Sequence, residues 1–177
     1  ERRRRASSTK SIVAELLPFA GWDVARRLKN APGSVKAEVL RQFQQCLDML
    51  QLEYVDLLLI HWPNDAVPLE ETLGAFEQLH AAGQVRSIGV SNFSVVQLRE
   101  AQQAMTKYPV VSNQVLYNLK RRQIERDLIP YCVDNRITVM AYTPLADGSL
   151  SGKSRFPSDK RGAILEKVAQ EVGKTPA

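Results

Sequence analysis

Cysteine is scarce in this 177-residue sequence, which contains only Cys46 and Cys132. Two cysteines are too few for a disulfide framework, and both lie in helical apolar patterns, which favours reduced thiols in a core. No apolar run approaches the roughly 20 residues that a membrane helix needs, and no signal-peptide pattern opens the chain. We therefore expect a cytoplasmic protein that does not cross a membrane.

Several motifs that carry chemistry are also missing from the sequence. No G-x-G-x-x-G follows a predicted strand, which argues against an open dinucleotide-binding sheet. The sequence contains no H-E-x-x-H, no paired C-x-x-C and no G-x-S-x-G, so neither metal-dependent nor serine-dependent hydrolysis is supported. We expect no metal site.

Charge is unevenly distributed along the chain. Residues 1–36 hold nine basic and three acidic residues, whereas the remainder of the chain is close to neutral. The arginine run at 2–5 could bind phosphate groups, but no aromatic residue is interleaved with it to stack on a base. We expect no nucleic-acid partner, and we interpret residues 1–33 as a basic N-terminal segment separate from the domain at 34–177.

Helical spacing and short apolar runs alternate from Ser34 onward. The runs that predict buried strands lie at 55–63, 85–90, 110–115 and 137–142. Helical patterns separate these runs, with Ser34 and an S-x-x-Q box at Ser94 placed as caps and Gly83 placed as a helix stop. This order predicts an α/β fold with a parallel sheet. Because a closed barrel needs about 250 residues, we expect a partial (β/α)8 TIM barrel of four to five βα units, with a fifth strand near the start.

Each predicted strand is apolar in its body and polar at its carboxyl end. The polar groups at the four ends are His61-Trp62, Ser91-Asn92, Ser112-Asn113-Gln114 and Tyr142-Thr143. In a βα barrel such ends meet at one rim, where active sites form, so they predict a polar ring around a pocket.

Structural roles remain open for several of these residues. His61 could bond a loop carbonyl, Asn92 and Asn113 could hold local turns, and Trp62 and Tyr142 could pack at the rim. Two other residues, His80 on a helix and Asp56 at the start of a strand, are better explained by packing or stability than by chemistry.

Four stretches in succession resemble the aldo-keto reductase family. They are YVDLLLIHWPN at 54–64, GQVRSIGVSNF at 83–93, VVSNQVLYN at 110–118 and ITVMAYTPLADG at 137–148. The first is similar to that family's fourth strand, and the others follow as its fifth, sixth and seventh strands. The resemblance implies an internal part of the barrel, starting at strand three or four.

The resemblance also implies an activity. That activity is hydride transfer between NADP(H) and a small-molecule carbonyl substrate, which would reduce aldehydes or ketones to alcohols. In that family His61 would be the catalytic histidine that orients the substrate carbonyl, and Trp62 would contact the substrate. Residues matching the family's cofactor contacts are Ser91, Asn92 and Gln114 at the nicotinamide carboxamide, Tyr142 stacked on the ring, and Thr143 and Leu145 near the diphosphate.

The sequence departs from the family pattern at both ends. No counterpart of the catalytic Asp and Tyr precedes Ser34, and the eighth strand is absent. Lys10, after Ser8-Thr9, is our candidate for the catalytic lysine, with Lys29 as the alternative. We expect this chain alone to be nearly inactive. The alternative function is a non-enzymatic binding or regulatory subunit, with self-association through exposed strand edges.

Overall fold

The computed structural model describes residues 13–16, 35–148, 150 and 160–175. Its five strands form one sheet in which every neighbouring pair is parallel and the spatial order is the chain order. The strands are β1 (Val13–Leu16), β2 (Leu57–Ile60), β3 (Ile88–Ser91), β4 (Val110–Leu116) and β5 (Thr138–Tyr142). This arrangement is a partial (β/α)8 barrel, as the alternating pattern predicts.

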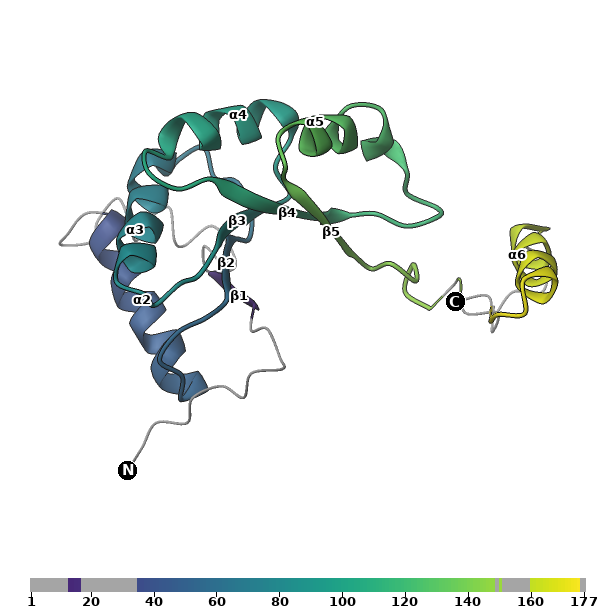
Figure 1. Ribbon diagram of the computed structural model, residues 1–177, viewed down its shortest axis with the longest axis horizontal. Coiled ribbons are helices and arrows are strands. Elements are labelled where there is room, and N and C mark those ends of the chain that lie inside the picture. Colours follow the sequence, from purple (N-terminus) through teal and green to yellow (C-terminus); the bar gives the residue numbers. More distant parts are fainter. Residues whose placement is uncertain (1–12, 17–34, 149, 151–159, 176–177) are drawn as a thin grey trace.

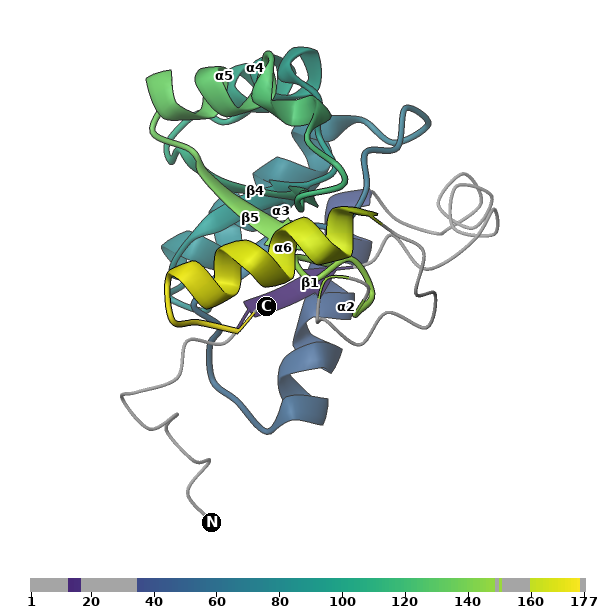
Figure 2. The same cartoon turned by 90° about the vertical axis from the view of Figure 1, so that its right-hand side faces the viewer.

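Helices alternate with the strands along the chain, and all but the last cover one side of the sheet (Figure 1). They are α2 (Val35–Leu50), α3 (Leu69–Ala81), α4 (Val95–Ala104), the short 3₁₀ turn η1 (Gln123–Glu125), α5 (Leu128–Asp134) and α6 (Lys160–Glu171). Helices α2 to α5 follow the outside of the curved sheet, whereas α6 lies apart from it (Figure 1). Figure 2 shows α4 and α5 above strands β4 and β5. No helix in the described ranges is both long enough and apolar enough to cross a membrane.

The core lies between the sheet and these helices. Alternate strand residues such as Leu58, Ile88 and Val90 are fully or almost fully buried, and they share one apolar cluster with Phe43 and Phe76 of the helices. Burying a side chain of this size contributes about 1.5 to 3 kcal/mol, so this outer layer supplies much of the stability. The opposite, inner face of the sheet carries the remaining strand side chains.

On the inner face of the sheet, neighbouring atoms lie close to Gly89. A Cβ atom at Gly89 would lie 2.2 Å from the Oγ atom of Ser112 and 2.5 Å from Cδ2 of Leu59. A side chain at residue 89 would therefore force Ser112 and Leu59 to shift, so glycine allows this close approach within the sheet.

Local signals in the sequence are confirmed at two helix ends. Ser94 and Gln97 form the predicted capping box of α4. Gly83, with a φ of 73°, follows the last turn of α3. The predicted cap Ser34 lies outside the described residues.

The predicted strand at 85–90 is wrong at both ends, because β3 spans Ile88–Ser91. Val85 makes only an isolated bridge with Val55, so the ladder with β2 becomes continuous only from Ile88. Apolar character at Val85 reflects burial in the core rather than strand pairing. The 3₁₀ turn η1 was not predicted either, since its three residues have no apolar periodicity.

The predicted fifth strand exists as β1, which pairs with β2 from Val13↔Leu57 to Leu16↔Ile60. It lies within the segment 1–33, so part of that basic segment belongs to the sheet. The domain boundary at residue 34 stays a prediction.

Candidate active site

Polar residues gather at the carboxyl ends of four neighbouring strands. His61 follows β2, Ser91 ends β3, Gln114 lies near the end of β4 and Tyr142 ends β5. The register pairs Ser91 with Gln114, and pairs Leu116 with Tyr142 two residues further along β4. Because all five strands are parallel, these residues share one edge of the sheet, which we call the carboxyl edge.

Asn92 joins the four strand ends. Its Nδ2 atom donates to the His61 carbonyl oxygen at 3.1 Å and to the Ser91 Oγ atom at 3.1 Å. Its Oδ1 atom accepts a hydrogen bond from the Tyr142 hydroxyl at 3.0 Å, and its backbone N–H donates to the Gln114 carbonyl oxygen at 2.8 Å. Asn92 adopts a φ of 62°, a left-handed conformation that asparagine tolerates better than most residues. The structure thus brings these predicted site residues together.

Ser91 and Gln114 differ in the hydrogen-bonding groups that they leave available to a ligand. Ser91 is fully buried, and its hydroxyl donates to the Gln114 carbonyl oxygen at 2.9 Å. The half-buried side-chain amide of Gln114 makes no hydrogen bond to any described residue. Gln114 therefore presents both a donor and an acceptor to a ligand, whereas Ser91 mainly holds its neighbours in place.

Asn113, by contrast, bonds to the backbone of a neighbouring loop. This fully buried residue donates from Nδ2 to the Phe93 carbonyl oxygen at 2.8 Å, and its Oδ1 accepts from the Phe93 N–H at 3.4 Å. It therefore holds the loop between β3 and α4 from the neighbouring strand β4 and does not stabilise a turn of its own.

The segment after β5 forms a tight turn with positive φ angles. Thr143, Ala146 and Asp147 have φ values of 48°, 49° and 54°, and Gly148 has a φ of 78°. The Ala146 N–H donates to the Thr143 carbonyl oxygen at 3.0 Å and closes the turn. The same carbonyl accepts a second bond, at 3.0 Å, from Nδ2 of Asn118, a residue that the sequence did not single out.

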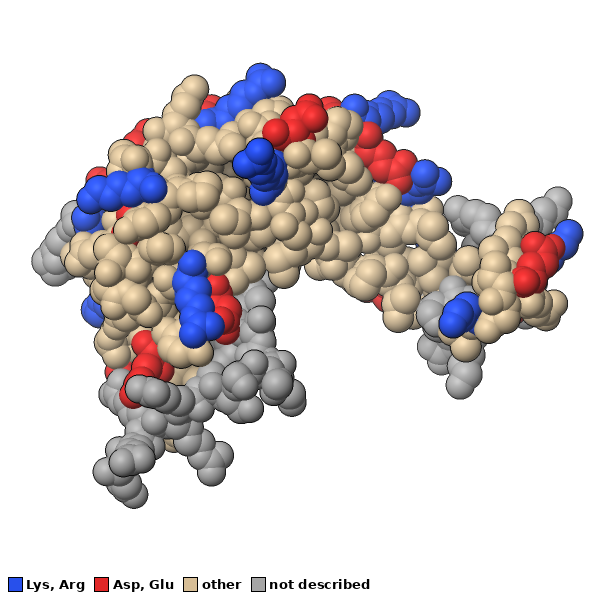
Figure 3. Space-filling model, in the orientation of Figure 1, with Lys and Arg blue, Asp and Glu red and all other residues tan. Residues whose placement is uncertain are grey.

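Three apolar or aromatic groups lie beside this cluster. His61 is half-buried, and its ring centroid lies 6.3 Å from that of Trp62, with the two ring planes tilted by 55°. Trp62 and Leu145 are both about half exposed. Figure 3 shows charged side chains scattered over the face of the molecule seen in Figure 1. Exposed apolar surface at the carboxyl edge is therefore contributed by Trp62 and Leu145.

Comparison with known proteins identifies the family. The model of the aldo/keto reductase family matches residues 22–177. The chain belongs to the aldo/keto reductase family. It is 43% identical over 143 residues to the methylglyoxal reductase YeaE of Escherichia coli K12, covering 81% of this chain and 46% of that protein.

Solved aldo-keto reductases share the fold. The thermostable aldo-keto reductase Tm1743, solved with the inhibitor epalrestat, superposes with a TM-score of 0.76 and 36% identity. The Klebsiella pneumoniae aldo/keto reductase solved with NADP and acetate gives a TM-score of 0.67 and 32% identity. The matches cover 93% of this chain and 53% and 52% of those chains. The chain spans less than half the length of the curated relatives it matches.

The described residues do not include either candidate for the catalytic lysine. The described strand that pairs with β2 is β1, Val13–Leu16. Lys10 and Lys29 both lie outside the described residues. The identity of the catalytic lysine stays a prediction.

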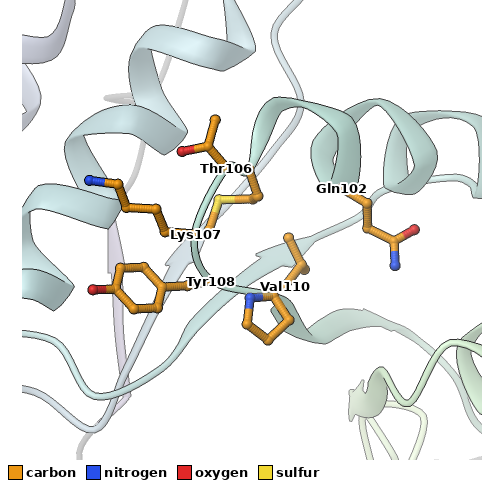
Figure 4. Close-up of a pocket in the computed structure, with 7 residues that line it drawn as sticks. Gln102, Thr106, Lys107, Tyr108 and Val110 are labelled. Atoms are coloured by element: carbon orange, nitrogen blue, oxygen red, sulfur yellow. The ribbon is translucent and has the colours of Figure 1, made fainter.

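A separate hollow lies at the other end of the sheet. Its volume is about 290 Å³, and it is lined by the end of α4 and the start of β4, from Gln102 to Val110. Lys107 and Tyr108 point away from Gln102, so the polar groups do not converge on a ligand (Figure 4). The described residues contain no group of three or more His, Cys, Asp or Glu that could hold a metal ion.

At the amino ends of the strands, which we call the amino edge, polar side chains are paired with other groups of this chain. The Glu77 carboxylate accepts from the N–H groups of Thr106 and Lys107 at 2.7 and 2.6 Å and from the Thr106 hydroxyl at 2.8 Å. Burial raises the pKa of Glu77, but these hydrogen bonds outweigh burial and hold the pKa below its usual value. Asp56 pairs with Arg86 at 2.9 Å, which supports its predicted role in stability.

Proposed function

We propose that this chain contributes the nicotinamide-binding edge of an NADP(H)-dependent oxidoreductase that reduces aldehydes and ketones to alcohols. The observation that carries the proposal is the Asn92 network, which joins the ends of four parallel strands beside the Gln114 amide, a group without a partner among the described residues. The Klebsiella pneumoniae neighbour solved with NADP supports this choice of cofactor.

The site residues fit the carboxamide of a nicotinamide ring. A carboxamide offers one acceptor oxygen and two N–H donors, and the Gln114 amide offers the complementary donor and acceptor. Asn92 Oδ1 accepts one bond from Tyr142 and has a further lone pair for a carboxamide N–H. Ser91 acts by fixing the Asn92 side chain, to which its Oγ is hydrogen-bonded.

Tyr142 would provide the flat surface against which the ring stacks. Its hydroxyl bond to Asn92 restricts rotation of the phenol ring, so the ring is ordered before the cofactor binds. When bound, the cofactor supplies the hydride. Thr143 and Leu145, which begin the turn after β5, would lie near the diphosphate.

His61 and Trp62 would handle the substrate. His61 would orient the substrate carbonyl and assist proton transfer, and the exposed Trp62 would cover the apolar part of the substrate. We assign the catalytic lysine to Lys10, with Lys29 as the alternative. Because the E. coli relative is a methylglyoxal reductase, we propose small 2-oxoaldehydes as the substrate class.

The isolated chain should turn over substrate slowly, because it shows no counterpart of the family's tyrosine acid. A positioned proton donor typically contributes about 10²- to 10⁴-fold to the rate. We propose that the protein works in the cytoplasm, where NADPH is available.

Binding and turnover should therefore be tested separately. We expect NADPH to bind the chain in a titration that follows tryptophan fluorescence, and methylglyoxal reduction to be slow. Asn92→Gly removes the side-chain network while tolerating the positive φ, so it should abolish NADPH binding without unfolding the protein. Asn135→Ala, at an exposed helix end, is the control. Failure of the wild-type chain to bind NADPH would contradict the proposal.

A second candidate function is that of a non-enzymatic subunit. β1 and β5 are the two outer strands of the sheet, and such edges can pair with another chain. Light scattering over a concentration series tests this candidate, since a chain that stays monomeric at high concentration argues against it.

A further inference from the structure

Asn118 links two loops at the carboxyl edge. It is buried, and its Oδ1 atom accepts from the N–H groups of Lys120 at 2.9 Å and Arg121 at 3.0 Å within its own loop. Its Nδ2 atom crosses to the next loop and donates to the Thr143 carbonyl oxygen at 3.0 Å. One asparagine side chain therefore shapes the loop after β4 and holds the loop after β5.

The cross-loop bond continues the sheet beyond its last backbone pair. The ladder between β4 and β5 ends at Leu116↔Tyr142, and Asn118 bonds the residue that follows Tyr142. β5 is an outer strand among the described strands, so its backbone is paired on the β4 side only. The Asn118 bond therefore restrains the strand end where Tyr142 lies.

The Thr143 carbonyl oxygen accepts two hydrogen bonds that hold the turn after β5. It accepts both the Ala146 N–H, which closes the turn, and the Asn118 amide. Thr143, Ala146 and Asp147 all adopt left-handed conformations, which are unfavourable for residues such as threonine and alanine. A turn with this much backbone strain persists only when its surroundings hold it.

The loop that carries Asn118 is itself braced. The Tyr117 hydroxyl donates to Glu125 at 2.6 Å, and Arg122 donates two bonds to the same carboxylate at 2.8 and 2.9 Å. Asn118 also exchanges backbone hydrogen bonds with Arg121. The donor is therefore held by its own loop independently of Thr143.

We propose that Asn118 is a positioning residue that fixes the turn at 143–148 in the shape that receives the cofactor diphosphate. This inference rests on the proposed function, because it takes that turn as part of an NADP(H) site. Asn118 acts through the Thr143 carbonyl and does not itself contact the cofactor.

The substitution Asn118→Asp should remove the hydrogen bond to Thr143 and keep those to Lys120 and Arg121. A carboxylate still accepts the Lys120 and Arg121 N–H groups, but it presents an oxygen, in place of a donor, to the Thr143 carbonyl. Asn135→Asp is the matched control, because Asn135 also donates to a backbone carbonyl, that of Tyr131, at an exposed helix end.

Two ligands distinguish a loss of affinity that is caused by the turn from one that is caused by the nicotinamide contacts. We expect Asn118→Asp to raise the Kd of NADPH and of 2′-phospho-ADP-ribose, which lacks nicotinamide, each by about tenfold. Asn135→Asp should change neither Kd. Unchanged binding of 2′-phospho-ADP-ribose by Asn118→Asp would overturn the inference, even if the variant melts at a lower temperature.

Hydrogen exchange tests the positioning role without a cofactor. The Ala146 amide, bonded to Thr143, should exchange faster in Asn118→Asp than in the wild type or in Asn135→Asp. If the wild-type chain does not bind NADPH, the proposed function fails, and this amide alone decides whether Asn118 holds the turn. An unchanged exchange rate would show that it does not.

Discussion

The carboxyl edge and the amino edge of the sheet differ in how their polar groups are satisfied. At the amino edge, the buried Glu77 carboxylate has three backbone or hydroxyl donors within 2.8 Å, and Asp56 is paired with Arg86. At the carboxyl edge, the Gln114 amide has no partner among the described residues, and backbone strain accumulates at Asn92 and Thr143.

This difference separates stability from binding within one sheet. Polar groups that satisfy one another at the amino edge stabilise the fold and leave nothing for a ligand. Strained residues at the carboxyl edge cost stability, and the Gln114 amide, which has no partner among the described residues, is available to a ligand. Substitutions at the amino edge should therefore change the free energy of unfolding, and those at the carboxyl edge should change cofactor affinity.

The largest effect is expected from Glu77→Ala. The substitution leaves the N–H groups of Thr106 and Lys107 without their acceptor, so it should lower the free energy of unfolding by about 2 to 3 kcal/mol. Urea denaturation followed by circular dichroism measures this loss. Glu77→Gln keeps one acceptor oxygen and should lose less, and equal stability of all three proteins would contradict the assigned role.

The pH dependence of stability provides a second test of Glu77. Its pKa is lowered in the folded state, so its contribution is complete above the unfolded-state pKa of about 4.3 and is lost as the pH falls through the folded-state value. The stability difference between the wild type and Glu77→Gln should therefore shrink below about pH 4. A difference that is constant from pH 7 to pH 3 would show that the carboxylate charge is unimportant.

Gln114→Ala should produce the largest change in binding at the carboxyl edge. Since the amide has no partner within the described part of the chain, its removal should change the melting temperature little. The Kd of NADPH should rise by about tenfold, which corresponds to about 1.4 kcal/mol for lost hydrogen bonds to the carboxamide. Binding of 2′-phospho-ADP-ribose should not change, and a tenfold loss there would argue that Gln114 acts on the turn instead.

Much of the fold could be predicted because the sequence patterns that indicate its helix ends involve residues close together in the chain. The capping box at Ser94 and the stop at Gly83 each involve residues within a few positions of one another. The strand at 85–90 was misplaced because burial and strand pairing give the same apolar signal at Val85. β1 was expected without bounds, since four residues are too short for a clear period.

The candidate site could be predicted in part for a similar reason. Polar residues after apolar runs located Ser91, Asn92, Gln114 and Tyr142, because parallel strands place their carboxyl ends at one edge. Asn118 was missed because its partner Thr143 is 25 positions away, and this contact exists only after β4 and β5 have paired. The network also uses the His61 carbonyl oxygen, which the sequence does not distinguish from any other.

Tyr142→Phe should have a smaller effect than Gln114→Ala. The phenyl ring keeps its stacking surface, but the bond to Asn92 Oδ1 at 3.0 Å is lost, so the ring is less restricted before the cofactor binds. We expect the Kd of NADPH to rise by about threefold, close to 0.6 kcal/mol for one exchanged hydrogen bond. Tyr54→Phe, on the amino edge, is the control, and an equal change in both variants would remove the distinction between the edges.

Arg86→Met should have the smallest effect, although it removes two contacts. Arg86 pairs with Asp56 at 2.9 Å and lies 4.2 Å from the centre of the Tyr54 ring, but its side chain is 60% exposed. Exposed ion pairs contribute little because water and salt screen them, so the free energy of unfolding should fall by about 0.5 kcal/mol. The difference from the wild type should shrink in 1 M salt, where the Debye length is about 3 Å. NADPH affinity should not change, and a measurable loss would mean that the amino edge also shapes the cofactor site.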